Sequence, residues 1–321
     1  MKNGPDARRL VTVLRGGKAD RVPNFEIVIN RRNLAAILEK EPSGTSLWNI
    51  PPEEALAVVL AVRQDAIPCP LQFYLPRGSV YTGDDLQGVR IPEISERRDK
   101  LSKFLSVAAG TGVGVCACLS GPFTASCMTS GPAPIESFLL MIYEDPETVE
   151  RLLDFYTSYS IAVIQGIHDL PFDFFYIGDD VTGFVRPGHL EELWAGRHEK
   201  IIRAALDTGK PVLCHCCGSQ KEVLPYFNRW GVHAIHPLQP DMNDIYSVRK
   251  EYPHIALVGN ISVQDVLSFG TPEAVRADTL NHLERLAPDG GYVVGSSHSI
   301  IDSVPPENYR AMLNATWEYS E

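Results

Sequence analysis

The sequence predicts an α/β protein built as a single (β/α)8 barrel, the TIM barrel fold. Eight short runs rich in β-branched and aromatic residues are spread along the 321 residues, and most end in small or polar residues. Segments with helical spacing lie between these runs, and strand alternating with helix eight times is typical of this barrel. A doubly wound sheet is the competing fold. It would need a glycine-rich phosphate turn after an early strand, and the sequence has none there.

The expected strands become more regularly spaced in the second half of the chain. They cover residues 22–28, 66–73, 113–122, 172–180, 211–219, 232–240, 255–263 and 292–300. The clearest expected helices cover residues 145–167, 189–209 and 271–288. Two of them begin with Asp-Pro or Thr-Pro, a pair typical of a helix start, and "DTG" and "APDGG" are typical helix ends.

Length and composition favour one large domain. The chain is 44% hydrophobic, which is sufficient for a sizeable core, and it has no repeat, low-complexity tract or linker. We therefore expect residues 1–321 to form a single barrel domain with an N-terminal helical extension at about residues 1–20. The long loop that follows Phe73 is expected to cover the mouth of the barrel.

Charge and cysteine content exclude several classes of protein. The net charge of −11 argues against a general nucleic-acid binder, which needs a basic face. No segment is apolar for long enough to span a bilayer, and the N-terminus has no secretory apolar stretch. The seven cysteines are odd in number and clustered, unlike a disulfide framework. We expect a reduced, cytoplasmic, soluble protein.

The active site of a (β/α)8 enzyme is formed at the carboxyl ends of its strands. In this sequence those ends carry an unusual number of titratable and metal-binding groups, which packing alone explains poorly. They are Glu26, Asp179, Asp180, His215, Cys217, His236, Asn260, Ser297 and His298.

The run "CHCCG" at residues 214–218 is the strongest single signal of a metal site. Alternate side chains of a strand point to opposite faces, so His215 and Cys217 can share the barrel mouth. Cys214 and Cys216 would then face the helical layer as small apolar side chains. A pair of ligands is a weak motif, and a buried strand rich in Cys and His is the competing interpretation. A zinc site needs a third ligand, for which His298 is the best candidate.

The remaining candidates have more than one interpretation. Glu26 is a possible fourth metal ligand. Asp179 and Asp180 are candidate catalytic residues, although either can simply cap the following turn. Phe25, Asn260 and Ser297 are candidate substrate-binding residues, and Phe25, like Trp48 and Tyr74, fits an aromatic pocket as well as ordinary packing. We expect His236 to be a satisfied histidine of the barrel, and Cys116 and Cys118 to be barrel packing.

Several stretches together resemble the uroporphyrinogen decarboxylase superfamily over essentially the whole chain. They are "RRLVTVLRGGKADRVPNFE", "GPFTASCMTSG", "MIYEDPETVERLLDFYT", "GKPVLCHCCGSQKEVLPYFNRWGVHAI", "ALVGNISV" and "GGYVVGSSHSIIDSVPPENYRAM". The resemblance implies a (β/α)8 barrel, in agreement with the strand pattern.

The superfamily has two main chemical branches, and the resemblance favours the second. True uroporphyrinogen decarboxylases need no metal and hold their substrate's acidic arms with an R-Q-A-G-R element. This element is missing here, where the corresponding stretch is "FEIVINRRNLAAIL". The other branch comprises zinc-dependent methyltransferases that work with corrinoid proteins and bind zinc through H-x-C and a later Cys. His215 and Cys217 match the first pair, whereas His298 stands in place of the last Cys.

The exchange of a thiolate for an imidazole raises the net charge of such a site by one unit and makes the metal more electrophilic. This favours polarising an ether oxygen over activating a thiol. We therefore expect a zinc-dependent methyltransferase that moves a methyl group from a methyl ether, for example a methoxylated aromatic, to the corrinoid (cobalamin) of a partner protein. The alternatives are a metal-free decarboxylase of a carboxylated substrate and a non-catalytic binder of a corrinoid or tetrapyrrole.

Overall fold

A seven-stranded parallel sheet forms the centre of the molecule. The computed structural model describes residues 4–76, 90–130 and 133–320. Neighbouring strands follow the chain in order from the first to the last. The strands are β1 (Ala66–Pro70), β2 (Gly114–Ser120), β3 (Phe174–Gly178), β4 (Val212–His215), β5 (Ala234–His236), β6 (Ala256–Val258) and β7 (Tyr292–Val293). Each lies within a segment that the sequence predicts to be a strand.

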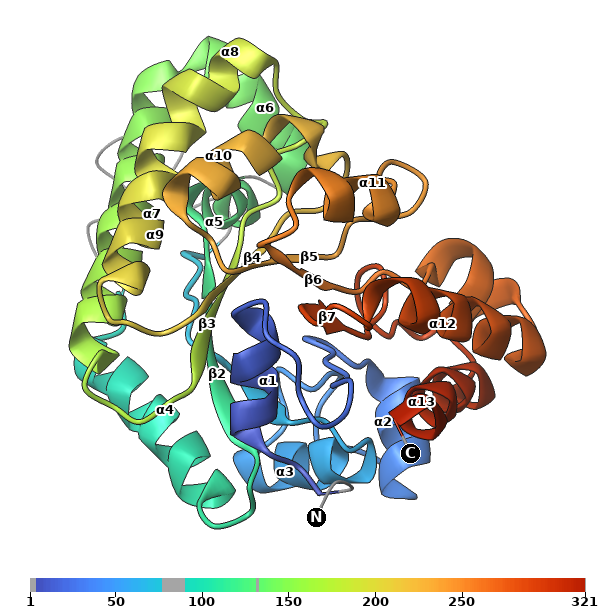
Figure 1. The fold of residues 1–321 in the computed structure, drawn as a ribbon. Coiled ribbons are helices and arrows are strands. Elements are labelled where there is room, and N and C mark those ends of the chain that lie inside the picture. The colour runs from blue at the N-terminus through green and yellow to red at the C-terminus, as the bar shows by residue number, and fades with distance from the viewer. Residues whose placement is uncertain (1–3, 77–89, 131–132, 321) are drawn as a thin grey trace.

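Helices surround the sheet, as Figure 1 shows. The first half of the chain contributes α1 (Ala7–Leu14), α2 (Arg31–Leu38), α3 (Pro52–Ala61), α4 (Ile94–Ala108), α5 (Pro122–Thr129), α6 (Pro134–Glu144) and α7 (Pro146–Ile167). The second half contributes α8 (Pro187–His189), the π-helical turn η1 (Leu190–Ala195), α9 (Gly196–Leu206), the 3-10 turn η2 (Gln220–Glu222), α10 (Leu224–Trp230), α11 (Ile245–Glu251), the π-helical turn η3 (Val263–Leu267), α12 (Pro272–Leu286) and α13 (Pro306–Ser320).

The helix starts predicted from Asp-Pro and Thr-Pro are confirmed. The side chain of Asp145 accepts a hydrogen bond from the backbone of Thr148 at the start of α7. Thr271 caps α12 through the backbone of Ala274 in the same way. In both helices proline occupies the first position, where a missing N–H costs nothing.

The first predicted strand, residues 22–28, is not a regular strand, so the described residues form seven of the eight strands that the sequence predicts. This segment forms isolated parallel bridges from Asn24 to Val294 and from Ile29 to Ile300. On its other side, the segment is joined to β1 by the Gln64 side chain instead of by backbone hydrogen bonds. Its Oε1 accepts from the Glu26 N–H at 2.8 Å, and its Nε2 donates to the carbonyls of Glu26 at 3.2 Å and Ala66 at 2.8 Å.

Strand alternation divides the apolar residues into two clusters. Inward-facing side chains of the strands, among them Cys116, Cys118 and Leu213, form an inner cluster with Phe25 and Ile27. Outward-facing residues such as Cys214 and Cys216 belong to the larger cluster between the sheet and the helices. The packing predicted for all four cysteines is therefore confirmed.

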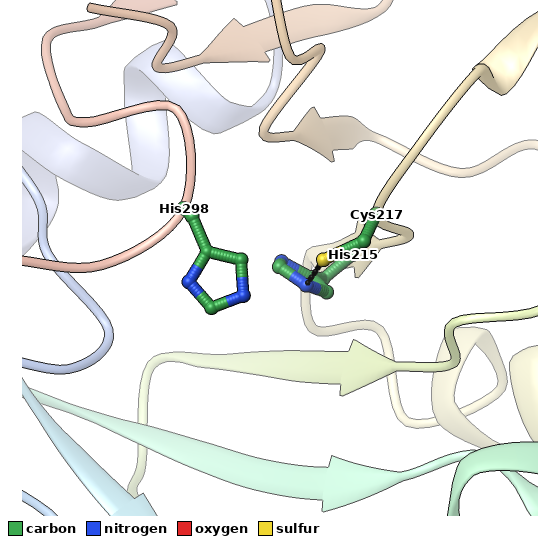
Figure 2. Close-up of side chains that lie close together, drawn as sticks. All are labelled: His215, Cys217 and His298. Carbon is green, nitrogen blue, oxygen red and sulfur yellow. Dashed lines mark hydrogen bonds between the residues drawn. The ribbon is translucent and has the colours of Figure 1, made fainter. Parts of the chain in front are cut away.

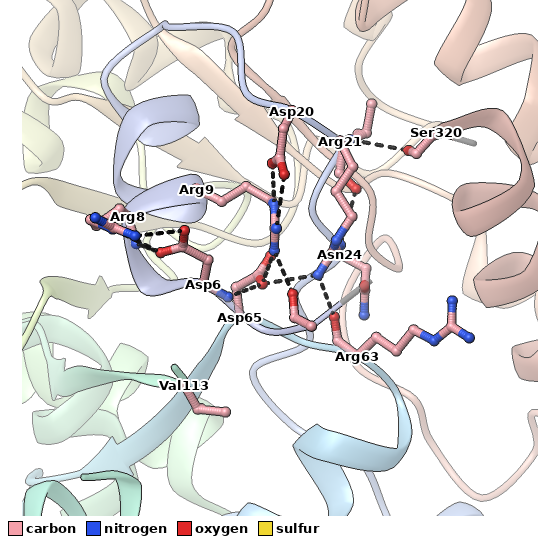
Figure 3. A network of polar contacts seen from close by, with 12 residues as sticks. Asp6, Arg8, Arg9, Asp20, Arg21, Asn24, Arg63, Asp65, Val113 and Ser320 are labelled. Atoms are coloured by element: carbon pink, nitrogen blue, oxygen red, sulfur yellow. Dashed lines mark hydrogen bonds and ion pairs between the residues drawn. The ribbon is translucent and has the colours of Figure 1, made fainter. Parts of the chain in front are cut away.

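Helix α1 joins the inner cluster through Leu10, Val13 and Leu14, and Figure 1 shows it in the middle of the ring of strands. A buried ion-pair network attaches this N-terminal segment to the start of β1 (Figure 3). Asp65 accepts from Arg9 at 2.6 Å and from Arg21 at 2.9 Å. Asp65 thus anchors the N-terminal helix, and its neighbour Gln64 anchors the irregular segment of residues 22–28.

The loop predicted to cover the mouth falls largely on residues 77–89, which lie outside the described residues. Within the described ranges, no helix is long and apolar enough to cross a membrane.

We predict that Gln64→Leu lowers the free energy of unfolding by about 2–4 kcal/mol, because it removes three buried hydrogen bonds and leaves their backbone partners unsatisfied. Urea unfolding monitored by tryptophan fluorescence measures the change. Gln165→Leu, on the exposed surface of α7, is the matched control and should change stability by less than about 0.5 kcal/mol. Equal stability of the two variants would contradict the bridging role of Gln64.

Candidate metal centre and cavity

Three metal-binding side chains meet at the carboxyl edge of the sheet. His215 is the last residue of β4, Cys217 follows two residues later, and His298 lies in the loop after β7. Their ligand atoms all lie within 4.8 Å of one another, and among the described residues they form the one such group of His, Cys, Asp or Glu. Figure 2 shows the His298 ring facing the other two side chains from the opposite side.

The spacing of these atoms suits a zinc ion. Nε2 of His215 lies 3.2 Å from Sγ of Cys217. In a tetrahedral zinc site with bonds of about 2.0–2.3 Å, neighbouring ligand atoms are separated by roughly 3.3–3.6 Å. Two imidazoles and one thiolate are ligands that zinc accepts, and three protein ligands leave a fourth position open. The residues present therefore fit the metal that the sequence predicts.

Asp180 lies directly beside this group. Its Oδ1 accepts a hydrogen bond from the backbone N–H of Cys217 at 2.8 Å and lies 3.4 Å from Nε2 of His215. Burial acts to raise the pKa of Asp180, but the charge and hydrogen bond of His215 and the bonds from Cys217 outweigh it and lower the pKa below its ordinary value. Asp180 is therefore a carboxylate at neutral pH.

The same environment acts in the opposite direction on the thiol. Burial, followed by the negative charge of Asp180, raises the pKa of Cys217. The thiol keeps its proton in the absence of a metal, so metal binding must release a proton. Burial and the neighbouring His215 lower the pKa of His298, which outweighs the opposing effect of Asp180. A neutral imidazole with a free lone pair is the form in which His298 can ligate a metal.

A cavity of about 220 Å³ opens beside these side chains. Its wall combines aromatic, aliphatic and hydroxyl groups around Asp180, His215 and His298. The other lining residues are Ile27, Val28, Trp48, Tyr74, Leu119, Ser120, Thr124, Tyr176, Gly178 and Ser299. Among these lining residues, all of which the structure describes, there is no Lys or Arg.

Of the two adjacent aspartates, only Asp180 lines the cavity. Asp179 points towards the helical layer, where it accepts from the backbone of Thr124 at 2.7 Å and from the indole of Trp194 at 2.9 Å. His198 lies 3.3 Å from the same carboxylate. Asp179 thus holds the start of α5, a helix earlier in the chain, and not the following turn for which the sequence left a capping role open.

Glu26 is also turned away from the metal-binding group, so the expectation of a fourth ligand at this position is not met. Its two oxygens accept from the backbone N–H and the hydroxyl of Ser296, both at 2.7 Å. Its neighbours Phe25 and Ile27 belong to the inner cluster, and alternation therefore directs Glu26 outwards. Burial raises the pKa of Glu26 to about 8, although both bonds from Ser296 oppose the shift.

The three expected substrate-binding residues have structural contacts and do not line the cavity. Phe25 packs edge-on against Phe174 inside the barrel, with ring centroids 5.6 Å apart. The Asn260 amide donates to the carbonyl of Leu238. The Ser297 hydroxyl accepts from the backbone of Val263 at 2.9 Å.

Other residues, missed as site candidates, occupy the cavity wall instead. Ser120 ends β2, and the rule applied to the other strand ends would have included it. Its hydroxyl lies 2.7 Å from that of Tyr74. Ser299 lies one residue beyond His298, in a loop whose path the sequence does not predict. Trp48 and Tyr74, which the sequence left undecided between pocket and packing, both line the cavity.

Comparison with known proteins shows the family to which this chain belongs. Residues 79–319 match the family described as uroporphyrinogen decarboxylase (URO-D). The chain belongs to the uroporphyrinogen decarboxylase family. This membership confirms the family predicted from the sequence.

The relatives of this family member include methyltransferases, the branch expected from the sequence. Methylated-thiol–coenzyme M methyltransferase of Methanosarcina mazei is 23% identical over 203 residues, which are 62% of this chain and 52% of the relative. The chain thus spans about half the length of that relative. A solved methyltransferase structure from Methanosarcina mazei matches with a TM-score of 0.71 and 19% identity over 98% of each chain, which is a likeness of fold.

We predict that Glu26→Gln makes this family member less sensitive to alkaline pH. The pKa of this buried carboxyl group is about 8 in the folded state, against 4.5 for the ordinary group. Between these two pH values the group is protonated in the folded state and ionised in the unfolded state. Stability therefore falls as pH rises through this window, by about 3 kcal/mol between pH 5 and pH 8. Urea unfolding across this pH range measures the slope, which should be smaller in Glu26→Gln.

Glu26→Gln also tests whether Glu26 is a metal ligand. Because Glu26 points away from the group of His215, Cys217 and His298, its amide variant should bind zinc as tightly as the native protein. Loss of zinc from Glu26→Gln at neutral pH would restore Glu26 to the ligand set.

Proposed function

We propose that this protein is a zinc-dependent methyltransferase that moves a methyl group from a methyl ether, such as a methoxylated aromatic compound, to a corrinoid protein. The observation that carries the proposal is the group of His215, Cys217 and His298 at the edge of a small cavity. Such a group lies at the carboxyl ends of the strands, where enzymes of this architecture bind their substrates.

Each of the three side chains has one role in holding the metal. Cys217 contributes the single thiolate, and the two histidines contribute neutral nitrogens. Bound zinc would act as a Lewis acid on the ether oxygen, and with one thiolate instead of two it is the more electrophilic metal. Asp180, beside His215, adds negative charge without belonging to the group of three.

The cavity wall favours an uncharged aromatic donor. Trp48, Tyr74 and Tyr176 offer ring faces and edges to a ligand, and aromatic rings pack well against one another at short centroid distances. The volume of about 220 Å³ suits a small molecule. A substrate with several carboxylates would find Asp180 and no Lys or Arg on this described wall, which argues against a decarboxylase of an acidic substrate.

The side chains of the cavity would orient the donor and serve its leaving oxygen. The carboxylate of Asp180 would accept a hydrogen bond from the methyl donor and so orient it relative to His298. On transfer, the oxygen would keep the electron pair of the broken C–O bond, and the methyl group would pass to the corrinoid acceptor. The hydroxyl pair of Tyr74 and Ser120, whose oxygens lie 2.7 Å apart, supplies a hydrogen bond to that oxygen.

The acceptor would be carried by a separate corrinoid protein, as the resemblance to the corrinoid-linked branch implies. This partner must approach the carboxyl edge of the sheet, because the ligand group and the cavity lie there. All seven cysteines are free thiols, which suits the reducing cytoplasm in which we expect the protein to act.

We predict about one zinc ion per chain in protein purified without chelator. Cys217→Ser should lower zinc affinity by about 10–100-fold or more, since a thiolate ligand is lost. Cys216→Ala is the matched control: Cys216 belongs to the apolar core, so this variant should cost stability and keep zinc. Metal analysis and chelator competition measure both effects. A metal-free native protein that is folded and fully active would refute the zinc site.

The donor class can be tested by single-turnover methylation of cob(I)alamin with a panel of methoxylated aromatics, methanol, methylamines and methylated thiols. We expect transfer from the aromatic ethers. His298→Cys should keep zinc but slow ether cleavage, by about 10-fold or more, because a second thiolate weakens the Lewis acid. Efficient transfer only from thiols would place the enzyme on the thiol side of the branch. Zinc binding without any transfer would favour a binding protein.

A further inference from the structure

The two nitrogens of His215 have different surroundings. Nε2 faces the site, 3.2 Å from the sulfur of Cys217. Nδ1 faces away from it and lies 2.7 Å from Nδ1 of His236, the last residue of the neighbouring strand β5. A contact this short between two ring nitrogens requires a proton between them, donated by one ring and accepted by the other.

The ligand role of His215 decides which ring donates. A neutral imidazole has one N–H, and a ring nitrogen that binds a metal must keep a free lone pair. If Nε2, the nitrogen that faces Cys217, binds the zinc ion, Nδ1 of His215 carries the proton. Nδ1 of His236 is then the acceptor in the 2.7 Å contact.

The backbone of His236 is held firmly beside His215. The side chain is 2% exposed, and strand pairing places His236 directly beside His215. Its carbonyl accepts from the backbone of Cys216 at 3.1 Å and from the Gln220 amide at 3.1 Å.

We propose that His236 is a positioning residue that holds His215 in the tautomer with its proton on Nδ1, so that Nε2 presents a lone pair to the zinc ion. The proposal rests on the zinc site of the proposed function. Metal-bound histidines commonly donate their second ring N–H to an oxygen acceptor, and loss of such a partner typically weakens metal binding by about 10–100-fold. Here a second, buried histidine takes the place of that oxygen.

The first test compares zinc affinities by competition with a chromogenic chelator. His236→Phe keeps a buried ring but removes the acceptor, so we expect a loss of about 10–100-fold. His236→Asn puts an amide oxygen near the position of Nδ1 and should recover most of the loss. His282→Phe is the control, since His282 is a buried histidine of α12 whose ring bonds the Asp278 carbonyl. It should leave zinc affinity unchanged. A folded His236→Phe variant with native affinity would overturn the proposal.

The second test needs no substitution and therefore does not depend on whether a variant folds. In zinc-bound protein labelled with 15N at histidine, the His215 signals should show a proton on Nδ1 and none on Nε2. A zinc-bound His215 ring without a proton on Nδ1 would overturn the proposal. Failure of the native protein to bind zinc, with His215 still protonated at Nδ1, would instead refute the proposed function and leave the tautomer assignment standing.

Discussion

Neighbouring side chains of a strand point to opposite faces of the sheet, and this constraint sorts the candidates of the site in adjacent pairs. Cys217 faces the metal-binding group while Cys216 is core. Asp180 lines the cavity while Asp179 caps a helix in the layer behind it. The alternation of side chains continues for a residue or two past the strand ends, where a barrel enzyme has its active-site residues. Each inward residue thus depends on an outward neighbour that fixes the backbone.

The outward-facing carboxylates have polar partners in other segments of the chain. These hydrogen bonds fix the positions of the site's segments relative to one another. Asp179 is held by the helix start at Thr124 and by Trp194. Glu26 is held by Ser296, two residues before His298. Because Ser296 holds Glu26 and precedes His298 in the same loop, the irregular first segment and the loop that carries His298 are tied together at one point. The site is therefore assembled from distant parts of the chain by buried hydrogen bonds.

The electrostatic character of the cavity follows from what this assembly brings inwards. A carboxylate, one thiol and two imidazoles line or flank it, and the described wall has no Lys or Arg. Anions are therefore disfavoured ligands, whereas a metal cation or an uncharged donor is not. This balance suits the methyltransferase branch better than the chemistry of acidic porphyrin precursors, for which the basic element is missing from the sequence.

The sequence by itself determined the strand-and-helix alternation, the family, and the pairing of His215 with Cys217, because hydrophobic periodicity and strand alternation are local properties. It also located His298, since the ends of parallel strands meet at one edge. Only the tertiary structure decided the faces of Glu26 and of the two aspartates, and the roles of Ser297 and Ser299. Those depend on the register between segments far apart in the chain, such as Glu26 with Gln64 and Ser296. The contact of His215 with His236 belongs to the same class, because it joins two strands whose pairing no local pattern specifies.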